Sequence, residues 1–355
     1  MKYTIALLAV IAFIAVGPIN AGEKKTDITK VKIGISVGHL QEERWQREID
    51  MFRAYAEEQG FKVLVQSAEQ NINNQIKQCE NLINQNIDVL ILQPVDSYSI
   101  SQIVDNAHEE GVPVIGYDIP SMKCDIDYFI TFDSYRVGEL QARDVIARQP
   151  KGNYMLIKGA PDNNNARLIS KAYQDVLGES IARGDITVVM DQFCNGWDPS
   201  VALRHSENAL SVVQNDIQGC VVSNDGMAGA VVQALDAQGL AGKVPVTGQD
   251  ADLSACQRIV EGTQTMTAYK PLAKVNQAAC QLMVAVAMGK DAATAIDPEL
   301  GTWQKYDNEF KMVDAFLVDV VPITKENIDE IIIKRDNFHS KEDVYRNLPR
   351  GQWPD

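Results

Sequence analysis

Residues 244–252 read Val-Pro-Val-Thr-Gly-Gln-Asp-Ala-Asp, an apolar run that ends in polar side chains. A short apolar run is typical of a buried parallel strand, and open α/β sheets bind ligands at the carboxyl ends of such strands. Gly248 can let the backbone turn sharply, and Gln249, Asp250 and Asp252 then place donors and acceptors at the end of the strand. The alternative is an ordinary loop in which Asp252 caps the next helix. The stretch alone does not decide between a ligand site and a capped loop.

The same pattern of a strand and a following helix recurs along the chain in two series. In the first series, predicted strands run from residues 31–37 to Tyr128–Phe132, and in the second from residues 153–158 to 265–269. Regular alternation of strands and helices predicts an α/β fold with parallel sheets covered by helices on both faces. Each connection from strand through helix to strand is expected to be right-handed.

The length of 355 residues suits two domains. No Gly-rich or Pro-rich linker separates the two series, so the chain is expected to pass directly between domains near residues 133–137. A helix predicted at 274–288 and a strand near 315–319 indicate that the chain crosses back and forth through a hinge, and such lobes close around a ligand. We assign residues 31–136 and about 270–306 to a first lobe, 137–269 and about 307–340 to a second lobe, and 341–355 to a polar tail, either docked or disordered.

Residues 1–21 are typical of a secretory signal peptide. Lys2 precedes an apolar run at residues 5–16, and Ala21 offers a small residue for cleavage before Gly22. A membrane anchor is the alternative, but the run is shorter than the ~20 residues of a spanning helix. No later segment approaches that length, so we expect a soluble mature protein in a periplasm.

The net charge and the cysteine spacing argue against two classes of site. A net charge of −15 argues against nucleic-acid binding, which needs a basic surface. The 6 cysteines are widely spread, without a Cys-x-x-Cys pair or a neighbouring histidine, so no metal site is predicted. Cys79, Cys220 and Cys280 lie in apolar contexts and are expected in the core, and the sequence leaves any disulfide pairing open.

Polar and aromatic side chains follow the predicted strands of both series. They include acids, amides, basic residues and tryptophans, with no paired nucleophile and base: Arg44, Trp45, Asp118, Asn163, Asn165, Trp197, Asn224, Asp250 and Lys270. A sugar hydroxyl both donates and accepts hydrogen bonds, so carboxylates and amides beside basic residues suit it, and charged partners strengthen the bonds. Trp45 and Trp197 can sandwich a sugar ring, although each alone is more typical of core packing. Asn224 is equally typical of a helix cap, and Lys270 of a solvated lysine.

Longer stretches carry a resemblance that runs from about residue 31 to 289, and more weakly to about 340. They are Glu43-Arg44-Trp45-Gln46, 128–133, Gly138-Glu139-Leu140-Gln141-Ala142, Asn164-Asn165-Ala166, Asn195-Gly196-Trp197, Ser223-Asn224-Asp225, 248–253 and 262–271. In these stretches the sequence resembles the periplasmic substrate-binding proteins of sugar ABC importers, and most closely the D-xylose-binding proteins. The resemblance implies a periplasmic binding protein type 1 fold, with two Rossmann-like lobes of parallel sheets flanked by helices and joined by a three-segment hinge. It also implies capture of a monosaccharide, D-xylose or a related pentose, delivery to the membrane subunits of an ABC importer, and no catalysis or cofactor.

The resemblance also assigns roles by position. Every residue of the candidate site except Asn163 matches a position that holds the pentose in those proteins. Ile119 stands where relatives carry an arginine, and Asn163 stands where they carry an acidic residue. The two changes remove charges of opposite sign, and we expect them to compensate because a buried carboxylate without its cation is costly. The sequence therefore predicts an affinity or specificity that differs from that of a typical xylose-binding protein.

The sequence also bears on other functions. Lobes of the same kind serve sugar-sensing proteins that present their ligand to a chemoreceptor or a sensor kinase. A transcription regulator is disfavoured because a signal peptide occupies the N-terminus and no DNA-binding helix pair precedes the first strand. Residues 34–38 lack the G-x-G-x-x-G pattern of dinucleotide enzymes, although carboxylates beside a sugar also occur in glycoside hydrolases. We expect a monomer that binds no nucleic acid.

Overall fold

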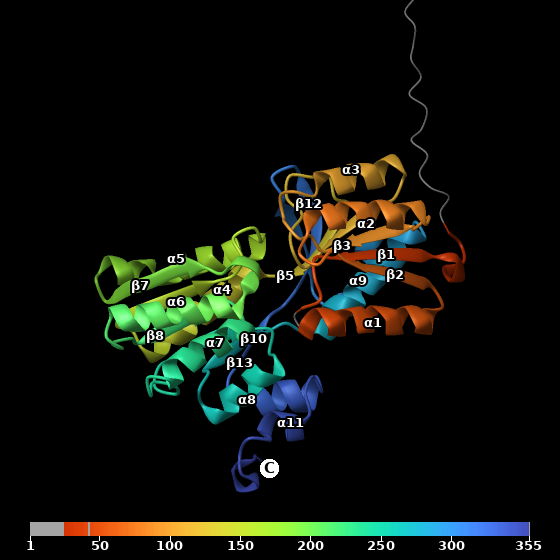
Figure 1. Ribbon diagram of the computed structural model, residues 1–355. Helices are drawn as coiled ribbons and strands as arrows, with labels where there is room; N and C mark the ends of the chain where they lie inside the picture. Colours follow the sequence, from red (N-terminus) through yellow and green to blue (C-terminus); the bar gives the residue numbers. More distant parts are fainter. Residues whose placement is uncertain (1–24, 42, 355) are drawn as a thin grey trace, which may run out of the picture.

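The computed structural model describes residues 25–41 and 43–354, and the predicted signal peptide lies outside them. The chain forms two α/β lobes that lie side by side (Figure 1). It passes between them after β5 (Tyr128–Phe132), after β10 (Met266–Tyr269) and after β12 (Met312–Val318). These crossings form the three-segment hinge, and the predicted fold class is confirmed. Within the described ranges, no helix combines the length and apolarity that a membrane crossing requires.

The sheet of the first lobe has seven strands in the order β11-β12-β5-β4-β3-β1-β2. Among the described strands of this sheet, every neighbouring pair is parallel except β11 with β12. The helices α1 (Glu43–Gln59) and α9 (Leu272–Ala287) pack on one face, and α2 (Ile72–Asn84) and α3 (Ser101–Glu109) pack on the other. Because both faces are covered, the central strands are apolar along their length. The remaining bounds are β1 (Lys32–Val37), β2 (Lys62–Ser67), β3 (Val89–Leu92), β4 (Val114–Tyr117), α10 (Ala292–Ala295) and β11 (Thr302–Asp307).

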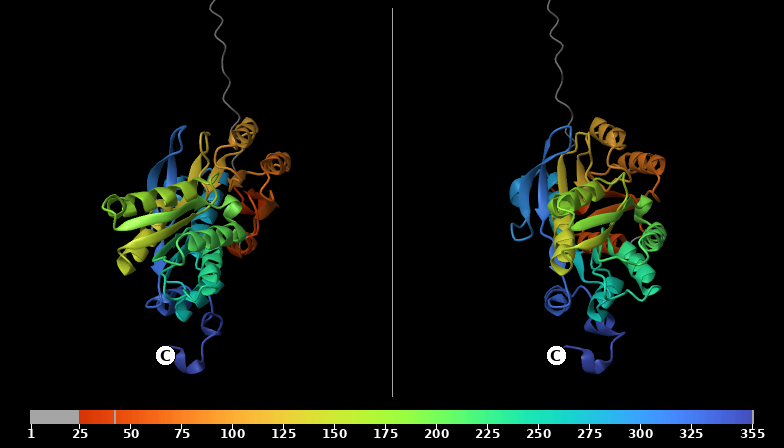
Figure 2. Two further views of the ribbon diagram at one scale, coloured as in Figure 1. Left: turned by 60° about the vertical axis from the view of Figure 1, so that its left-hand side comes forward. Right: turned by 90° about the vertical axis from the view of Figure 1, so that its left-hand side faces the viewer.

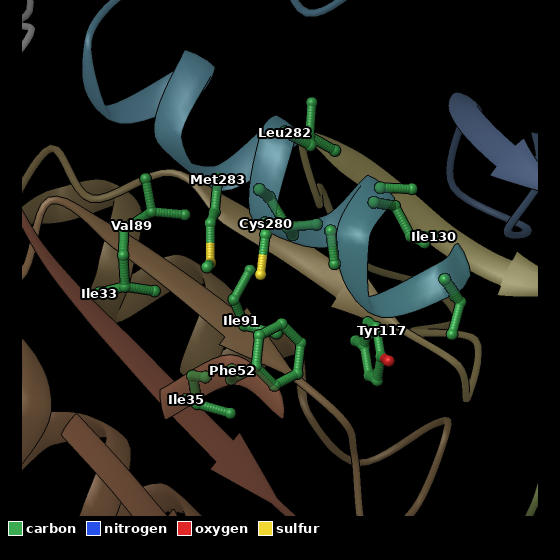
Figure 3. Packing of buried hydrophobic residues seen from close by; sticks show 14 of the residues in the cluster. Ile33, Ile35, Phe52, Val89, Ile91, Tyr117, Ile130, Cys280, Leu282 and Met283 are labelled. Carbon is green, nitrogen blue, oxygen red and sulfur yellow. The ribbon is translucent and has the colours of Figure 1, made fainter. Parts of the chain in front are cut away.

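The core of the first lobe explains why α9 belongs to it, although α9 follows the second lobe in the sequence. Cys280 and Met283 of α9 are buried together with Ile33, Ile91 and Phe52. Figure 3 shows these side chains packed between α9 and the strands. Full burial of an aliphatic or aromatic side chain stabilises the fold by about 1.5–3 kcal/mol. The burial of α9 therefore anchors the hinge segment that precedes it to the first lobe.

The second lobe contains two strand groups, β7-β6-β8 and β13-β10-β9, joined by a parallel bridge between Cys220 and Val246. Residues 244–252 supply this bridge and the strand β9 (Thr247–Gln249). One helix pair, α4 and α5, packs on one face of the sheet, and α6 and α7 pack on the other. The bounds are α4 (Ser134–Arg148), β6 (Gly152–Lys158), α5 (Asn164–Ala182), β7 (Ile186–Phe193), α6 (Pro199–Val212), β8 (Gly219–Val222), α7 (Asp225–Asp236), α8 (Leu253–Glu261) and β13 (Val321–Ile323).

One domain boundary differs from the sequence prediction. The prediction placed residues from about 307 onward in the second lobe, but β12 pairs in parallel with β5, with Asp314 opposite Tyr128, inside the first sheet. The chain crosses to the second lobe only between β12 and β13, which pairs with β10. Without β12, the apolar strand β5 would be an exposed sheet edge, and such edges are usually covered. The hairpin of β11 and β12 supplies that cover.

The C-terminal segment is docked against the second lobe. It contains a π-helix at Asp329–Arg335, the helix α11 (Lys341–Tyr345) and a short 3-10 turn at Arg350–Gln352. Ile332 and Tyr345 are buried in a cluster with residues of α8 and β10. Figure 1 shows α11 next to α8 at the lower end of the second lobe, and Figure 2 shows the C-terminal segment at the same end. Residues 341–354 of the predicted polar tail are therefore docked on the second lobe.

All of the cysteines are free and buried. Cys79, Cys220 and Cys280 lie in the hydrophobic cores, as predicted. Burial raises the pKa of each of these thiols. Each therefore behaves as a small apolar core residue.

Candidate functional site

A polar cavity lies between the lobes, at the carboxyl ends of the strands. Every residue predicted for the candidate site lines it. The lining residues are His39, Arg44, Trp45, Gln93, Asp118, Ile119, Asn163, Asn165, Trp197, Asn224, Gln249, Asp250 and Lys270. The cavity continues into a hollow of about 630 Å³ at the mouth of the cleft, which shares His39, Trp197, Asn224 and Asp250 with it. The two series of strands thus bring their polar ends together at one place.

The first-lobe wall is organised around the Arg44 guanidinium at the start of α1. Arg44 is 5% exposed and donates to Glu48 Oε1 from Nε at 2.9 Å and from Nη2 at 2.7 Å. The same Nη2 donates to Asp118 Oδ1 at 3.1 Å, and Nη1 donates to Asp250 Oδ1 of the second lobe at 3.5 Å. The hydroxyl of Tyr117 donates to the other oxygen of Glu48. The Arg44 guanidinium therefore donates hydrogen bonds to three buried carboxylates, one of them across the cleft.

Burial and Arg44 together set the protonation of this wall. Burial alone would raise the pKa of Asp118, but the positive charges of Arg44 and Lys270 outweigh it and hold that pKa below its ordinary value. Burial raises the pKa of Glu48, and the charge of Arg44 opposes the shift only in part. Burial also raises the pKa of Tyr117, helped by the negative charge of Glu48. Asp118 is accordingly ionised near neutral pH and accepts hydrogen bonds.

The second-lobe wall depends on an unusual backbone at Asp250 and Ala251. Their φ angles are 96° and 53°, in the left-handed region that side chains other than glycine rarely adopt. The Asp250 N–H donates to the Ala268 carbonyl at 3.0 Å, and the Ala251 N–H donates to Thr267 Oγ1 at 3.1 Å. These bonds to β10 hold the loop in its strained shape and direct Asp250 into the cavity.

A buried carboxylate beneath this loop was missed in the sequence. Asp225 is fully buried and accepts from the Asp252 N–H at 3.0 Å, from Thr267 Oγ1 at 2.8 Å and from Gln264 Nε2 at 2.8 Å. Burial raises the pKa of Asp225, and the nearby guanidinium of Arg258 opposes the shift. Asp225 thus positions the strand end that carries Asp250. The sequence offered only the polar pair at 224–225, which is also typical of a helix cap.

The structure corrects the role predicted for Gly248. Its φ lies outside the left-handed region, and the sharp turn falls at Asp250 and Ala251 instead. A Cβ at position 248 would lie 2.0 Å from Asp225 Oδ1, so glycine is needed for space. Asp252 occupies the N-cap position of α8, as the alternative interpretation expected, but its side chain makes no capping bond.

Lys270 lies where the chain crosses from β10 to α9. It is 4% exposed, and its Nζ lies 3.4 Å from Asp250 Oδ1. The alternative of a solvated lysine is therefore wrong. Asp250 receives one cation from the first lobe, Arg44, and one from the hinge.

The tryptophans come from different lobes and differ in their surroundings. Trp45 is 4% exposed, belongs to the first-lobe core, and lies with the Arg44 guanidinium 4.2 Å from its ring centroid. Trp197 is half-buried, and a Cβ at Gly159 would lie 2.3 Å from its ring. Trp45 thus belongs to the core and also lines the cavity, whereas the Trp197 ring packs against Gly159, where a side chain would clash with it.

The amide residues combine helix capping with lining of the cavity. Asn163 caps α5 by accepting from the Asn165 N–H at 2.9 Å, and Asn224 caps α7 by accepting from the Met227 N–H at 3.0 Å. Asn165 Nδ2 donates to the Asp118 carbonyl at 3.0 Å, across the two lobes. Both interpretations of Asn224 therefore hold, because its side chain caps a helix and faces the cleft.

Some polar atoms of the lining residues have no protein partner. Within the described residues, Trp45 Nε1, Gln93 Nε2 and Gln249 Oε1 are buried without a hydrogen bond. Buried polar groups in proteins nearly always have partners, so these atoms indicate a ligand with both donors and acceptors. Gln93 was missed in the sequence, although it ends a predicted strand just as the other site residues do. Within residues 25–41 and 43–354, no group of three or more His, Cys, Asp or Glu side chains is arranged to hold a metal ion.

Comparisons with known proteins agree with this geometry. A family model described as periplasmic binding protein domain matches residues 33–291. The D-xylose-binding periplasmic protein of Haemophilus influenzae is 43% identical over 97% of this chain and 100% of its own length. The protein of the same name from Escherichia coli is 42% identical over 89% of this chain and 93% of its own length. A carbohydrate transporter solute-binding protein from Chloroflexus aurantiacus, solved with D-glucose, is 26% identical and superposes with a TM-score of 0.80, covering 88% of this chain and 98% of the other.

Proposed function

The chain belongs to the periplasmic binding protein family, and we propose that it captures a monosaccharide, D-xylose or a related pentose, between its two lobes. The observation that carries the proposal is the cavity itself, which joins charged, amide and aromatic side chains from both lobes. Relatives more than 40% identical over most of the chain are D-xylose-binding proteins. Delivery of the sugar to the membrane subunits of an ABC importer follows from the family.

The lining residues suit a ring that carries several hydroxyl groups. The carboxylates of Asp118 and Asp250 accept hydrogen bonds from hydroxyls, and Arg44 and Lys270 donate to hydroxyl oxygens. Charged partners of this kind form the stronger hydrogen bonds. The ring face carries C–H groups, which pack on an aromatic surface such as Trp197. The donors and acceptors that line the cavity therefore match those of a sugar.

The specificity of the site depends on two positions where the sequence departs from the resembling proteins. Ile119 is 7% exposed and lines the cavity beside Asp118, while Asn163 lines it from α5. Asp118 keeps a cation despite Ile119 because Arg44 donates to it at 3.1 Å. We expect fewer charge-assisted bonds to one part of the sugar. The double variant Ile119→Arg with Asn163→Asp should then change the ranking of sugars, and a wild-type protein that binds xylose most tightly, at the strength usual for the family, would contradict this.

The location and the partners follow from the family in outline. The D-xylose-binding relatives are periplasmic proteins, which supports a periplasmic location, and we propose that the leader at residues 1–21 is cleaved on export. We further propose a monomer that docks on the importer. Sugar presentation to a chemoreceptor or sensor kinase is the alternative, and a strain that lacks this protein separates the two, since loss of uptake and loss of a sugar response are different phenotypes.

The experiment that tests the proposal is calorimetric titration of the refolded protein with xylose, arabinose, ribose, glucose and galactose. Refolding removes sugar that copurifies and would hide binding. Saturable heat at one site with a pentose is expected, together with no turnover of nitrophenyl pentosides. Absence of heat with every sugar in the panel would refute the proposed ligand, and release of nitrophenol would refute a purely binding role.

A further inference from the structure

The run from Asn163 to Asn165 at the start of α5 faces in two directions. Asn163 and Asn165 line the cavity, whereas Asn164 between them does not. Asn164 is nevertheless 8% exposed, because it packs against the first lobe. Its burial therefore depends on contact between the lobes, not on the cavity.

Hydrogen bonds cross the cleft at this point. The Asn164 N–H donates to Ser97 Oγ at 3.1 Å, and Asn164 Nδ2 donates to the Tyr306 hydroxyl at 3.0 Å. In return, the Ser97 N–H donates to the Asp162 carbonyl at 3.3 Å. We call Ser97, Tyr306 and Asn164 the latch. Ser97 and Tyr306 belong to the first lobe and Asn164 to the second.

The first-lobe side of the latch is closely packed. Ser97 is completely buried, and the Tyr306 ring packs edge-on against Phe129 at a centroid distance of 5.1 Å. Beside it, the Arg167 guanidinium of the second lobe lies 5.2 Å from the Tyr98 ring centroid of the first. A packed surface on one lobe thus meets the N-terminal turn of a helix on the other. Such an arrangement forms only when the lobes come together.

We propose that the latch stabilises the closed protein and sets its affinity for sugar without contacting the sugar. None of the latch residues lines the cavity, so the contribution of the latch is the same for every ligand that the closed form holds. The apparent dissociation constant is inversely proportional to the fraction of protein that is competent to bind. This affinity consequence rests on the proposed function, whereas the contact between the lobes does not.

The test compares latch variants with controls that lose a similar hydrogen bond inside one lobe. The latch variants are Asn164→Ala and Tyr306→Phe. The matched controls are Asn106→Ala, whose Nδ2 donates to Glu80 within the first lobe, and Tyr135→Phe, whose hydroxyl donates to Asp175 within the second. Calorimetry with xylose and other sugars gives the affinities. Stopped-flow tryptophan fluorescence gives the dissociation rates, because Trp45 and Trp197 line the cavity.

Each latch variant is expected to raise the dissociation constant of every sugar that binds by the same factor, about 3- to 10-fold. The rise should come mainly from faster dissociation. The controls should stay within about twofold of the wild type. The double variant should lose less than the product of the single losses, because the two side chains share one hydrogen bond. Factors that differ between sugars would overturn the proposal, since they would place Asn164 in contact with the ligand.

A measurement without sugar separates this proposal from the proposed function. If the wild type binds no sugar in the panel, the proposed function fails while the latch is still tested by small-angle X-ray scattering. The radius of gyration of Asn164→Ala should exceed that of the wild type and of Asn106→Ala. When no sugar binds, an unchanged radius would overturn the latch, and when a sugar binds, unchanged dissociation rates would overturn it. Ser97→Ala repeats the comparison from the other lobe if Asn164→Ala does not fold.

Discussion

The two walls of the cavity are built by different means. The first-lobe wall consists of Arg44 and Trp45 on a helix that is packed into the core, and its charges are already paired with one another. The second-lobe wall consists of a left-handed turn at Asp250 and Ala251 and of Trp197, whose ring packs against Gly159. The first wall therefore depends on electrostatic balance, and the second depends on backbone geometry. Substitutions in the two walls should fail in correspondingly different ways.

The largest effect is expected for Arg44→Met in the first wall. This change leaves the carboxylates of Glu48 and Asp118 buried without their cation, which typically costs about 3–5 kcal/mol. The free energy of unfolding in urea should fall by that amount, and sugar binding should be lost. Arg53→Met on the same helix is the control, because the Arg53 side chain is 59% exposed and pairs with Asp50 at the surface. Equal effects of the two substitutions would contradict the electrostatic account of this wall.

The tryptophans give the next largest difference. Trp45→Ala should lower the free energy of unfolding by about 3 kcal/mol as well as weaken binding, because Trp45 is a core residue. Trp197→Ala should cost about 1 kcal/mol or less of stability and still weaken binding at least about tenfold. Thermal unfolding and calorimetry measure the two quantities. A Trp197 variant that loses stability but keeps its affinity would contradict a role for Trp197 at the ligand.

A smaller effect tests the geometry of the second wall directly. In Gly159→Ala, the added methyl group meets the Trp197 ring, which must move, at a typical cost of about 1–3 kcal/mol. We expect weaker sugar binding by titration, with the first wall intact. Gly178→Ala in α5 has nothing within 4 Å of its Cβ and should stabilise the protein by about 0.5–1 kcal/mol. Unchanged sugar affinity in Gly159→Ala would contradict a role for Trp197 in the second wall.

The smallest effect lies outside both walls and separates stability from binding. His108 Nε2 lies 2.9 Å from Asp127 Oδ2, and this hydrogen bond raises the pKa of His108 above its ordinary value. A raised pKa in the folded protein stabilises it below about pH 6.5, and the contribution is lost as the pH rises through the folded pKa. Because His108 is near the surface, His108→Gln should cost less than about 1 kcal/mol at pH 5.5 and nothing at pH 8.5. A pH-independent cost would contradict this sign, and sugar affinity should stay unchanged.

Local sequence patterns predicted the elements and the strand ends that form the site. Polar residues after apolar runs located Asp118 and Asp250, because carboxyl ends of parallel strands meet at one edge of a sheet. Strand pairing was not predictable, since the pattern of β12 does not say which sheet it joins. The roles of Gly248, Asp225 and Asn164 were likewise hidden. Each depends on a neighbour that is distant in the sequence, and hydrophobic periodicity carries no information about such contacts.

The unpartnered polar atoms of the cavity are expected to bind the hydroxyl groups of a sugar. A crystal structure of the protein grown with D-xylose shows whether they do. We expect one sugar between the lobes, with hydroxyl groups within about 3.2 Å of Trp45 Nε1, Gln93 Nε2 and Gln249 Oε1. A sugar bound elsewhere, or a sugar in the cavity that leaves these atoms without partners, would contradict it.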